Sequence, residues 1–147
     1  MEERKNERLF IPIQLWNAMQ EHVEEETPIE ACGILGGKQA GVDIYARLSF
    51  PARNELRSAY RYRMDAHDQL EAFNELEDKG FELAAIYHSH PQGPASPSIT
   101  DIEQAHYPDS VYLIWAYDGN KWDCRGYTIR AGLVQEIPVI VTSANPD

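Results

Sequence analysis

The strongest constraint on how this chain can fold comes from residues 82–106. A mostly apolar run, Glu82 to Tyr87, is typical of a buried strand, and it leads directly into two histidines, His88 and His90. A loop with a proline at every third position follows, and Ser98 to His106 then has the pattern of a short helix. The segment therefore predicts a strand that delivers two imidazoles to the place where a stiff loop turns the chain into a helix.

Two further helices are predicted from apolar residues that recur every three or four positions. The first is Ile13–Glu26, which ends at Thr27 and Pro28. The second is Ala66–Lys79, with Asp65 as its N-cap and Gly80 as its C-terminal stop. Its apolar face is expected to consist of Leu70, Phe73 and Leu76.

Short apolar runs and alternating patterns predict the strands. They are Leu9–Ile11, Ala31–Leu35, Val42–Phe50, Glu82–Tyr87, Val111–Tyr117, Asp123–Arg130 and Leu133–Val141. Gly36 and Gly37 are expected to close the second of these, which pairs with the third across the turn KQAG. The mixed order of elements indicates an α+β protein with αβα-like layers around a largely antiparallel mixed sheet.

Length and composition fit one domain that spans residues 1–147. The chain is 43% hydrophobic, which is enough for one core, but it is too short for two ordinary domains. It lacks an apolar run of about 18 residues, and MEERKNERLF lacks the basic start and apolar stretch of a secretory signal. Cys32 and Cys124 form no CxxC pair and are expected to be buried thiols. We expect a cytoplasmic protein with no membrane segment.

The chain is acidic, with 24 Asp and Glu against 13 Lys and Arg and a formal net charge of -11. A surface of this charge repels phosphate backbones, so nucleic-acid binding is excluded as the main function. Charge alone leaves open whether the excess reflects a salt-rich host or only solubility.

Two histidines one residue apart in a strand point to the same side, about 6.5 Å apart along the chain, so His88 and His90 can bind one ion. Asp101 is the natural third ligand because the proline-rich loop can fold back onto the strand. Two nitrogens and one oxygen suit zinc better than magnesium or calcium, and a catalytic zinc site keeps its fourth position for water. Two structural interpretations compete: a polar turn at the histidines, and a capping box formed by Ser98 and Asp101.

The segment HSHP, six further residues, and Ser98 to Asp101 as S-x-x-D, together with Glu30 in PIEACGILGG, resemble the JAMM motif of the MPN (Mov34, PAD-1) family of zinc metallopeptidases. Every motif position matches. The likeness extends through PARN and YRMD, as in prokaryotic stand-alone members, although Ala66 stands where a proline is expected. The resemblance implies the MPN/JAMM fold and one zinc per chain.

In this family the distant glutamate acts as general acid and base, two histidines and an aspartate bind zinc, and the serine assists the tetrahedral intermediate. The resemblance therefore implies Glu30 and Ser98 as catalytic residues and His88, His90 and Asp101 as metal ligands. We expect a metal site and a helix cap to coexist here, with Ser98 and Asp101 turned from capping the helix toward the metal.

Family members cleave amide or isopeptide bonds after the C-terminal Gly-Gly of ubiquitin-like proteins, and prokaryotic ones are linked to sulfur-carrier proteins of that fold. The resemblance implies such a carrier as substrate and partner, with cysteine, lysine or another amine released. A general zinc peptidase for cell-wall or other small peptides is the alternative enzyme. A non-catalytic MPN scaffold is the alternative of another class, and the oligomeric state is left open.

Overall fold

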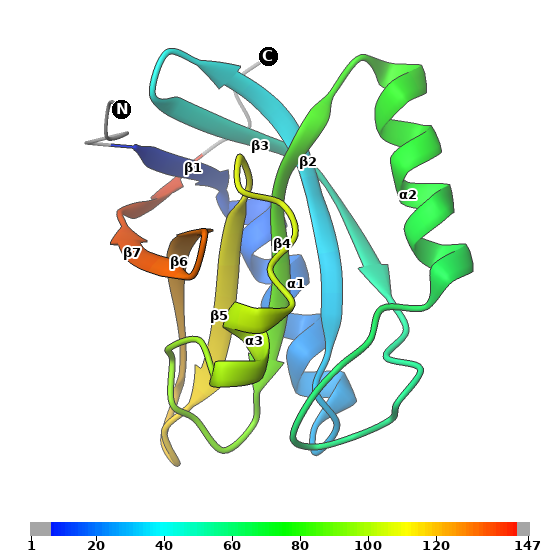
Figure 1. Cartoon of the computed structure of the whole chain (residues 1–147), viewed down its shortest axis with the longest axis vertical. Coiled ribbons are helices and arrows are strands. Elements are labelled where there is room, and N and C mark those ends of the chain that lie inside the picture. The colour runs from blue at the N-terminus through cyan, green and yellow to red at the C-terminus, as the bar shows by residue number, and fades with distance from the viewer. Residues whose placement is uncertain (1–6, 144–147) are drawn as a thin grey trace.

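Within residues 7–143, the part of the chain that the computed structural model describes, eight strands form one sheet (Figure 1). The strands are β1 (Arg8–Pro12), β2 (Cys32–Ala40), β3 (Asp43–Ala52), β4 (Glu82–His90), β5 (Val111–Tyr117), β6 (Trp122–Arg130), β7 (Leu133–Ile137) and β8 (Val139–Thr142). Their order in the sheet is β7-β6-β5-β4-β2-β3-β1-β8. Four neighbouring pairs are antiparallel and three are parallel, which confirms the mixed, mostly antiparallel sheet.

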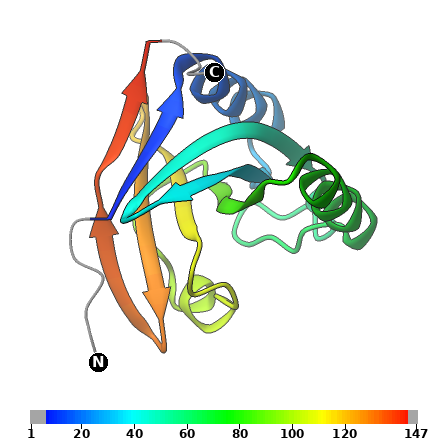
Figure 2. The ribbon, with the colours of Figure 1, turned by 90° about the horizontal axis from the view of Figure 1, so that it is seen from above.

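The two end strands of this order, β7 and β8, follow one another in the chain with only Pro138 between them. The sheet therefore curls until its two ends meet, as the view from above shows (Figure 2). The sequence pattern predicted one strand over Leu133–Val141. That prediction is wrong, because Pro138 has no N–H to donate to a ladder and divides the run into two strands with different partners.

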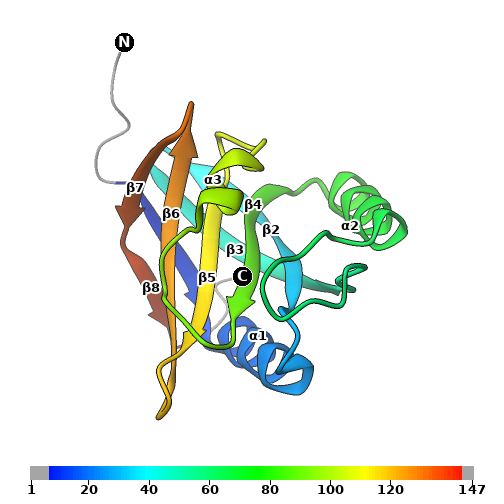
Figure 3. The same ribbon diagram turned by 60° about the horizontal axis from the view of Figure 1, so that its bottom comes forward.

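Helices cover both faces of the sheet, which confirms the αβα-like layers (Figures 1 and 3). Helix α1 (Ile13–Glu26) buries Met19 and Val23 in a core with inward residues of β4 and β5 such as Tyr87 and Leu113. Helices α2 (Ala66–Lys79) and α3 (Ile99–Glu103) pack against the opposite face. Among residues 7–143, none of the helices has the length and apolarity needed to cross a bilayer.

The bounds of α1 and α2 are those that the sequence predicts, because each helix is delimited by a residue with a clear local effect. Pro28 ends α1, Asp65 accepts a hydrogen bond from the backbone N–H of Asp68 as the N-cap of α2, and Gly80 ends α2 with a φ of 72°. The apolar face of α2 differs from the prediction. Its buried residues are Ala72 and Leu76, whereas Leu70 is 59% exposed.

Strand β2 runs past the glycines that were expected to end it. The bulge between Gly36 and Gly37 keeps both residues in the ladder with β3, and the hairpin turn lies at residues 41–42 instead of at KQAG. A Cβ on Gly37 would lie 2.0 Å from the backbone oxygen of Tyr45, so this glycine permits close strand packing.

Candidate metal centre

The two histidines of the HSH segment lie at the end of β4 and point to the same side of the sheet, toward α3. Their spacing of two residues produces this, since side chains alternate across a strand. The backbone of His88 pairs with Ile114 of the parallel strand β5, so this part of β4 lies between two neighbouring strands. The residue is 1% exposed. His90 is 8% exposed, and its Nδ1 lies 2.7 Å from the carbonyl oxygen of Pro94 in the loop that follows.

Three potential ligand atoms converge on one point. The Nε2 atoms of His88 and His90 are 3.0 Å apart, and each lies 3.2 Å from Oδ2 of Asp101. Neighbouring ligands of a tetrahedral zinc ion, bound at about 2.0–2.1 Å, lie about 3.3 Å apart. The donor types and their spacing therefore fit one zinc ion. The prediction that the proline-containing loop returns Asp101 to the histidines is confirmed.

Ser98 and Asp101 form both bonds of a capping box at the start of α3. The backbone N–H of Asp101 donates to Ser98 Oγ at 3.0 Å, and that of Ser98 donates to Asp101 Oδ2 at 2.9 Å. The cap and the convergence on the histidines coexist, as expected. The two residues do not turn away from capping, however, because the same Oδ2 caps the helix and faces the histidines. Capping uses a lone pair of Ser98 Oγ, so its O–H remains able to donate.

Glu30 contributes a second carboxylate beside the three converging atoms. It precedes β2, is 3% exposed, and has an oxygen within 4.8 Å of the ligand atoms of both His88 and His90. Among the described residues no group hydrogen-bonds to its buried Oε1. Burial raises the pKa of Glu30 to about 8, although the nearby His90 acts in the opposite direction.

Burial and hydrogen bonds shift the pKa values of the three converging side chains. Burial would raise the pKa of Asp101, but its hydrogen bonds with His88 and His90 outweigh this and hold the pKa well below its usual range. Burial lowers the pKa of His88. Burial also acts to lower the pKa of His90, but the bonds to Asp101 and Pro94 outweigh it and raise that pKa. Asp101 therefore stays a carboxylate and His88 a neutral imidazole, the forms that bind metals.

Tyr62 is a site residue that the sequence did not indicate. Its ring stacks on that of His88, with centroids 4.6 Å apart and planes at 26°. It lies on the long loop between β3 and α2, which runs beside the ends of β2 and β4 (Figure 3). Tyr62 and Tyr112 also line an adjacent cavity of about 320 Å³, together with Met64 and Phe73. The one sequence signal for this loop was the family likeness of PARN and YRMD at its two ends, which assigned no role to Tyr62.

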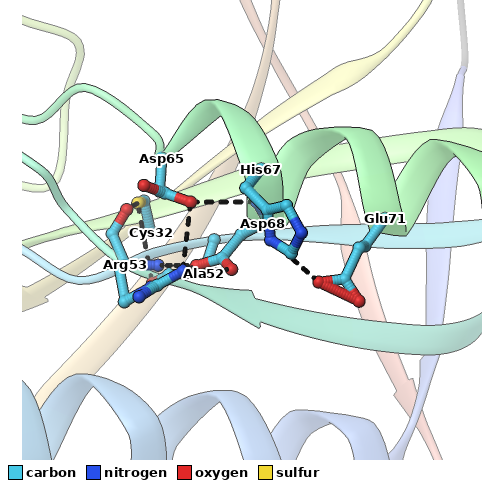
Figure 4. A network of polar contacts seen from close by, with 7 residues as sticks. All are labelled: Cys32, Ala52, Arg53, Asp65, His67, Asp68 and Glu71. Atoms are coloured by element: carbon cyan, nitrogen blue, oxygen red, sulfur yellow. Dashed lines mark hydrogen bonds and ion pairs between the residues drawn. The ribbon is translucent and has the colours of Figure 1, made fainter.

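A second group of potential ligands, Asp65, His67 and Asp68, lies at the start of α2 (Figure 4). Arg53 already occupies its centre: the guanidinium donates to Asp68 Oδ2 at 3.0 Å and to Asp65 Oδ2 at 3.2 Å. His67 is turned to Glu71, 3.0 Å away. This group is therefore an ion-pair network that ties the end of β3 to α2.

Two imidazoles and a carboxylate around one point, with a further buried carboxylate beside them, are typical of metal-dependent hydrolases. Comparison with known proteins defines the family. Residues 12–125 match the family described as prokaryotic homologs of the JAB domain, and the chain belongs to it. This confirms the resemblance to the JAMM/MPN proteins and the fold that it implied.

Relatives of known name support the same classification. The chain is 40% identical over 134 residues, 90% of each protein, to the CysO-cysteine peptidase of Mycobacterium tuberculosis. It is 32% identical over 119 residues to the desampylase of Haloferax volcanii, covering 76% of this chain and 83% of that protein. The solution structure of protein DSY2949 from Desulfitobacterium hafniense superimposes with a TM-score of 0.83 at 30% identity, covering 92% and 93% of the two chains.

Proposed function

We propose that this protein is a zinc-dependent JAMM peptidase that cleaves the amide or isopeptide bond after the C-terminal Gly-Gly of a ubiquitin-like sulfur-carrier protein. The observation that carries the proposal is the convergence of His88, His90 and Asp101 within 3.2 Å of one another, with the unpaired carboxylate of Glu30 beside them. A structural role explains the cap at Asp101, but it does not explain why the buried Oε1 of Glu30 has no hydrogen-bond partner among residues 7–143.

In this proposal His88, His90 and Asp101 hold one zinc ion per chain. The ion, when bound, supplies a Lewis acid and lowers the pKa of a water molecule toward 7. Glu30 accepts the proton of the attacking water and returns it to the departing amine, for which its raised pKa suits it. The free O–H of Ser98 donates to the carbonyl oxygen as negative charge develops there.

The Gly-Gly substrate is supported by the narrowness of the site. His88 is 1% exposed and the Asp101 side chain 12%, and both line a small crevice with Tyr62, Pro97 and Gln104. A chain with glycines next to the scissile bond suits such a narrow crevice, because it has no side chains there to accommodate. The cavity beyond Tyr62, with a mixed polar and apolar lining, offers a place for bulkier residues that precede the glycines.

The names of the relatives support a carrier substrate over a general peptidase. One is named a CysO-cysteine peptidase, and we infer a related carrier conjugate as substrate here. A scaffold without activity is disfavoured, because all five motif positions are occupied by residues able to act. The two buried cysteines are free thiols, which supports the cytoplasm as the compartment in which the protein works.

The test is a ubiquitin-like sulfur carrier with a cysteine or a lysine-containing peptide joined by an amide bond to its terminal glycine. The protein should release the carrier with a free C-terminal carboxylate, read by intact mass. Activity should stop with a chelator and return with zinc. Replacing the last glycine of the carrier by leucine should slow cleavage by about 10²-fold or more, because the crevice excludes side chains.

A short unrelated peptide is the matched control substrate. If the peptide is cut and the carrier conjugate is not, the general peptidase is the correct reading. If zinc-loaded protein cuts neither substrate, the chain is a scaffold.

A further inference from the structure

Glu30 stands outside the hydrogen-bond ladder that fixes its neighbours. Strand β2 begins at Cys32, whose pairing with His88 is the first contact of β2 with β4. The position of Glu30 relative to the histidines therefore depends on bonds other than those of the regular ladder. Two buried polar side chains, one on each side of Glu30, supply bonds of this kind.

The first of these residues is Ser89, which lies between the two histidines and points to the opposite face of β4. It is 0% exposed, and its Oγ accepts a hydrogen bond from the backbone N–H of Ala31 at 2.8 Å. Its own N–H donates to the carbonyl oxygen of Ala31 at 3.0 Å. Ser89 thus fixes the residue that follows Glu30 directly to the strand that carries His88 and His90.

The second is Asn54, at the start of the loop between β3 and α2, which is 5% exposed. Its Nδ2 donates to the carbonyl oxygen of Glu30 and to that of Arg61, both at 3.1 Å. Its Oδ1 accepts from the backbone N–H groups of Leu56 and Arg63, also at 3.1 Å. Asn54 therefore holds Glu30 and the loop together.

The loop in turn holds both Glu30 and a ring at the metal site. The backbone N–H of Glu30 donates to the carbonyl oxygen of Ser58 at 2.9 Å, and Tyr62 from the same loop stacks on His88. None of these bonds reaches the carboxylate of Glu30 itself. They restrain its backbone, so the carboxylate is free to exchange a proton while its position is fixed.

We propose that Ser89 and Asn54 are positioning residues for Glu30, clamping its backbone from two sides so that its carboxylate faces His88 and His90. This inference rests on the proposed function, in which Glu30 moves the proton. A proton carrier must lie within hydrogen-bond reach of the group it serves, and a displacement of about 1 Å can cost roughly 10²-fold in rate. Ser89 and Asn54, together called the clamp, therefore affect turnover without contact with the substrate.

The experiment compares Ser89→Ala, Ser89→Thr and Asn54→Ala, each made in the wild type and in Glu30→Gln. In the wild-type background Ser89→Ala and Asn54→Ala should each lower kcat about tenfold or more, with KM and zinc content unchanged. Ser89→Thr keeps the hydroxyl and should recover most of kcat. In the Glu30→Gln background the same changes should cost less than about twofold, because residues that act through one group are not additive.

Ser110→Ala is the matched control, since Ser110 is also buried and donates to the carbonyl oxygen of Leu83 at the far end of β4. It should leave kcat unchanged. An equal loss in both backgrounds would overturn the proposal, as would a loss for Ser110→Ala as large as that for Ser89→Ala.

Amide hydrogen exchange of Ala31 gives a readout that does not depend on turnover. Ser89→Ala should accelerate exchange at Ala31 by about tenfold or more while Leu113 in the core stays protected. If this acceleration occurs in a protein that cuts no substrate, the clamp stands and the proposed function fails. If exchange at Ala31 is unchanged, the clamp itself is refuted.

Discussion

Glu30 and Asp101 are two carboxylates whose surroundings shift their pKa values in opposite directions. Burial without a hydrogen-bond partner raises the pKa of Glu30 to about 8, whereas bonds from two imidazoles and from Ser98 hold that of Asp101 well below its usual range. Such a division is common where one carboxylate must carry a proton and the other must stay charged. The residue environment thus supports the separate roles proposed for them.

At the residue scale we predict that Glu30→Gln folds, binds zinc as the wild type does and loses most of its turnover. A glutamine has nearly the same shape but cannot accept and return a proton, and general acid-base catalysis contributes about 10²- to 10⁴-fold. Metal analysis, circular dichroism and the conjugate-cleavage rate check this on one preparation.

Glu103→Gln is the control for this prediction, because it removes an exposed carboxylate from α3 without changing the site. It should keep full activity. Loss of zinc from Glu30→Gln would instead place Glu30 among the metal ligands, a role that its oxygen within 4.8 Å of both histidines keeps geometrically accessible.

The sequence indicates the residues that we propose to carry the chemistry, but not those that we propose to position them. His88, His90 and Asp101 are recognisable because the chemistry demands those residue types at a fixed spacing. Asn54 and Tyr62 lie on a loop whose path depends on the tertiary structure, so no spacing rule applies to them. Ser89 reads as a polar residue between two histidines, and only the fold shows that it bonds to Ala31.

At the scale of the elements, α1 and β4 are connected by one polar pair within a largely apolar core. Nδ1 of His22 lies 2.7 Å from the Tyr87 hydroxyl, and the Tyr87 ring lies against Gly33 of β2, where a Cβ would come within 2.3 Å of it. Burial lowers the pKa of His22, while Glu25 and Glu26 on its own helix oppose the shift. The folded protein therefore favours the neutral imidazole.

This contact predicts how stability responds to acid at the element scale. The unfolded chain binds a proton on His22 near pH 6.5, whereas the folded chain binds it only at lower pH. The contribution of His22 to stability is therefore complete above pH 6.5 and declines as the pH falls below it. Urea denaturation from pH 7.5 to 5 should show a smaller decline for His22→Gln than for the wild type.

His106→Gln, a change at an exposed histidine beyond α3, should follow the wild-type curve and serves as the control. Parallel curves for the wild type and His22→Gln would show that His22 is protonated equally in both states.

The bounds of α1 and α2 were predictable because residues such as Pro28, Asp65 and Gly80 act locally, whereas α3 ends before its predicted bound. The bounds of the strands were less predictable. Gly36 and Gly37 looked like a turn, yet they lie within β2 because the ladder with β3 needs a close approach there. Local composition indicates that a glycine is required but not whether a turn or tight packing requires it.

For the whole molecule, the class of fold was predictable and the sheet order was not. Alternating helices and strands indicated αβα layers, but the crossing that places β4 between β2 and β5 depends on long-range pairing. That crossing brings the end of β4, the start of β2 and the start of α3 to one place. The site therefore joins segments from Glu30 to Asp101, and a bound metal is expected to link them.

The last prediction concerns the stability that this link provides. Protein purified without chelator should contain about one zinc per chain, and because only the folded chain brings the three ligands together, zinc should stabilise it. At a free zinc concentration about 100 times Kd the gain is about 2.7 kcal/mol, which raises Tm by roughly 5–10 °C for a chain of this size. Chelation should lower Tm by that amount and zinc should restore it. His88→Ala should contain little zinc and show no response to chelator, whereas His106→Ala, at an exposed position, should behave as the wild type. Equal zinc content in His88→Ala and the wild type would remove His88 from the metal site.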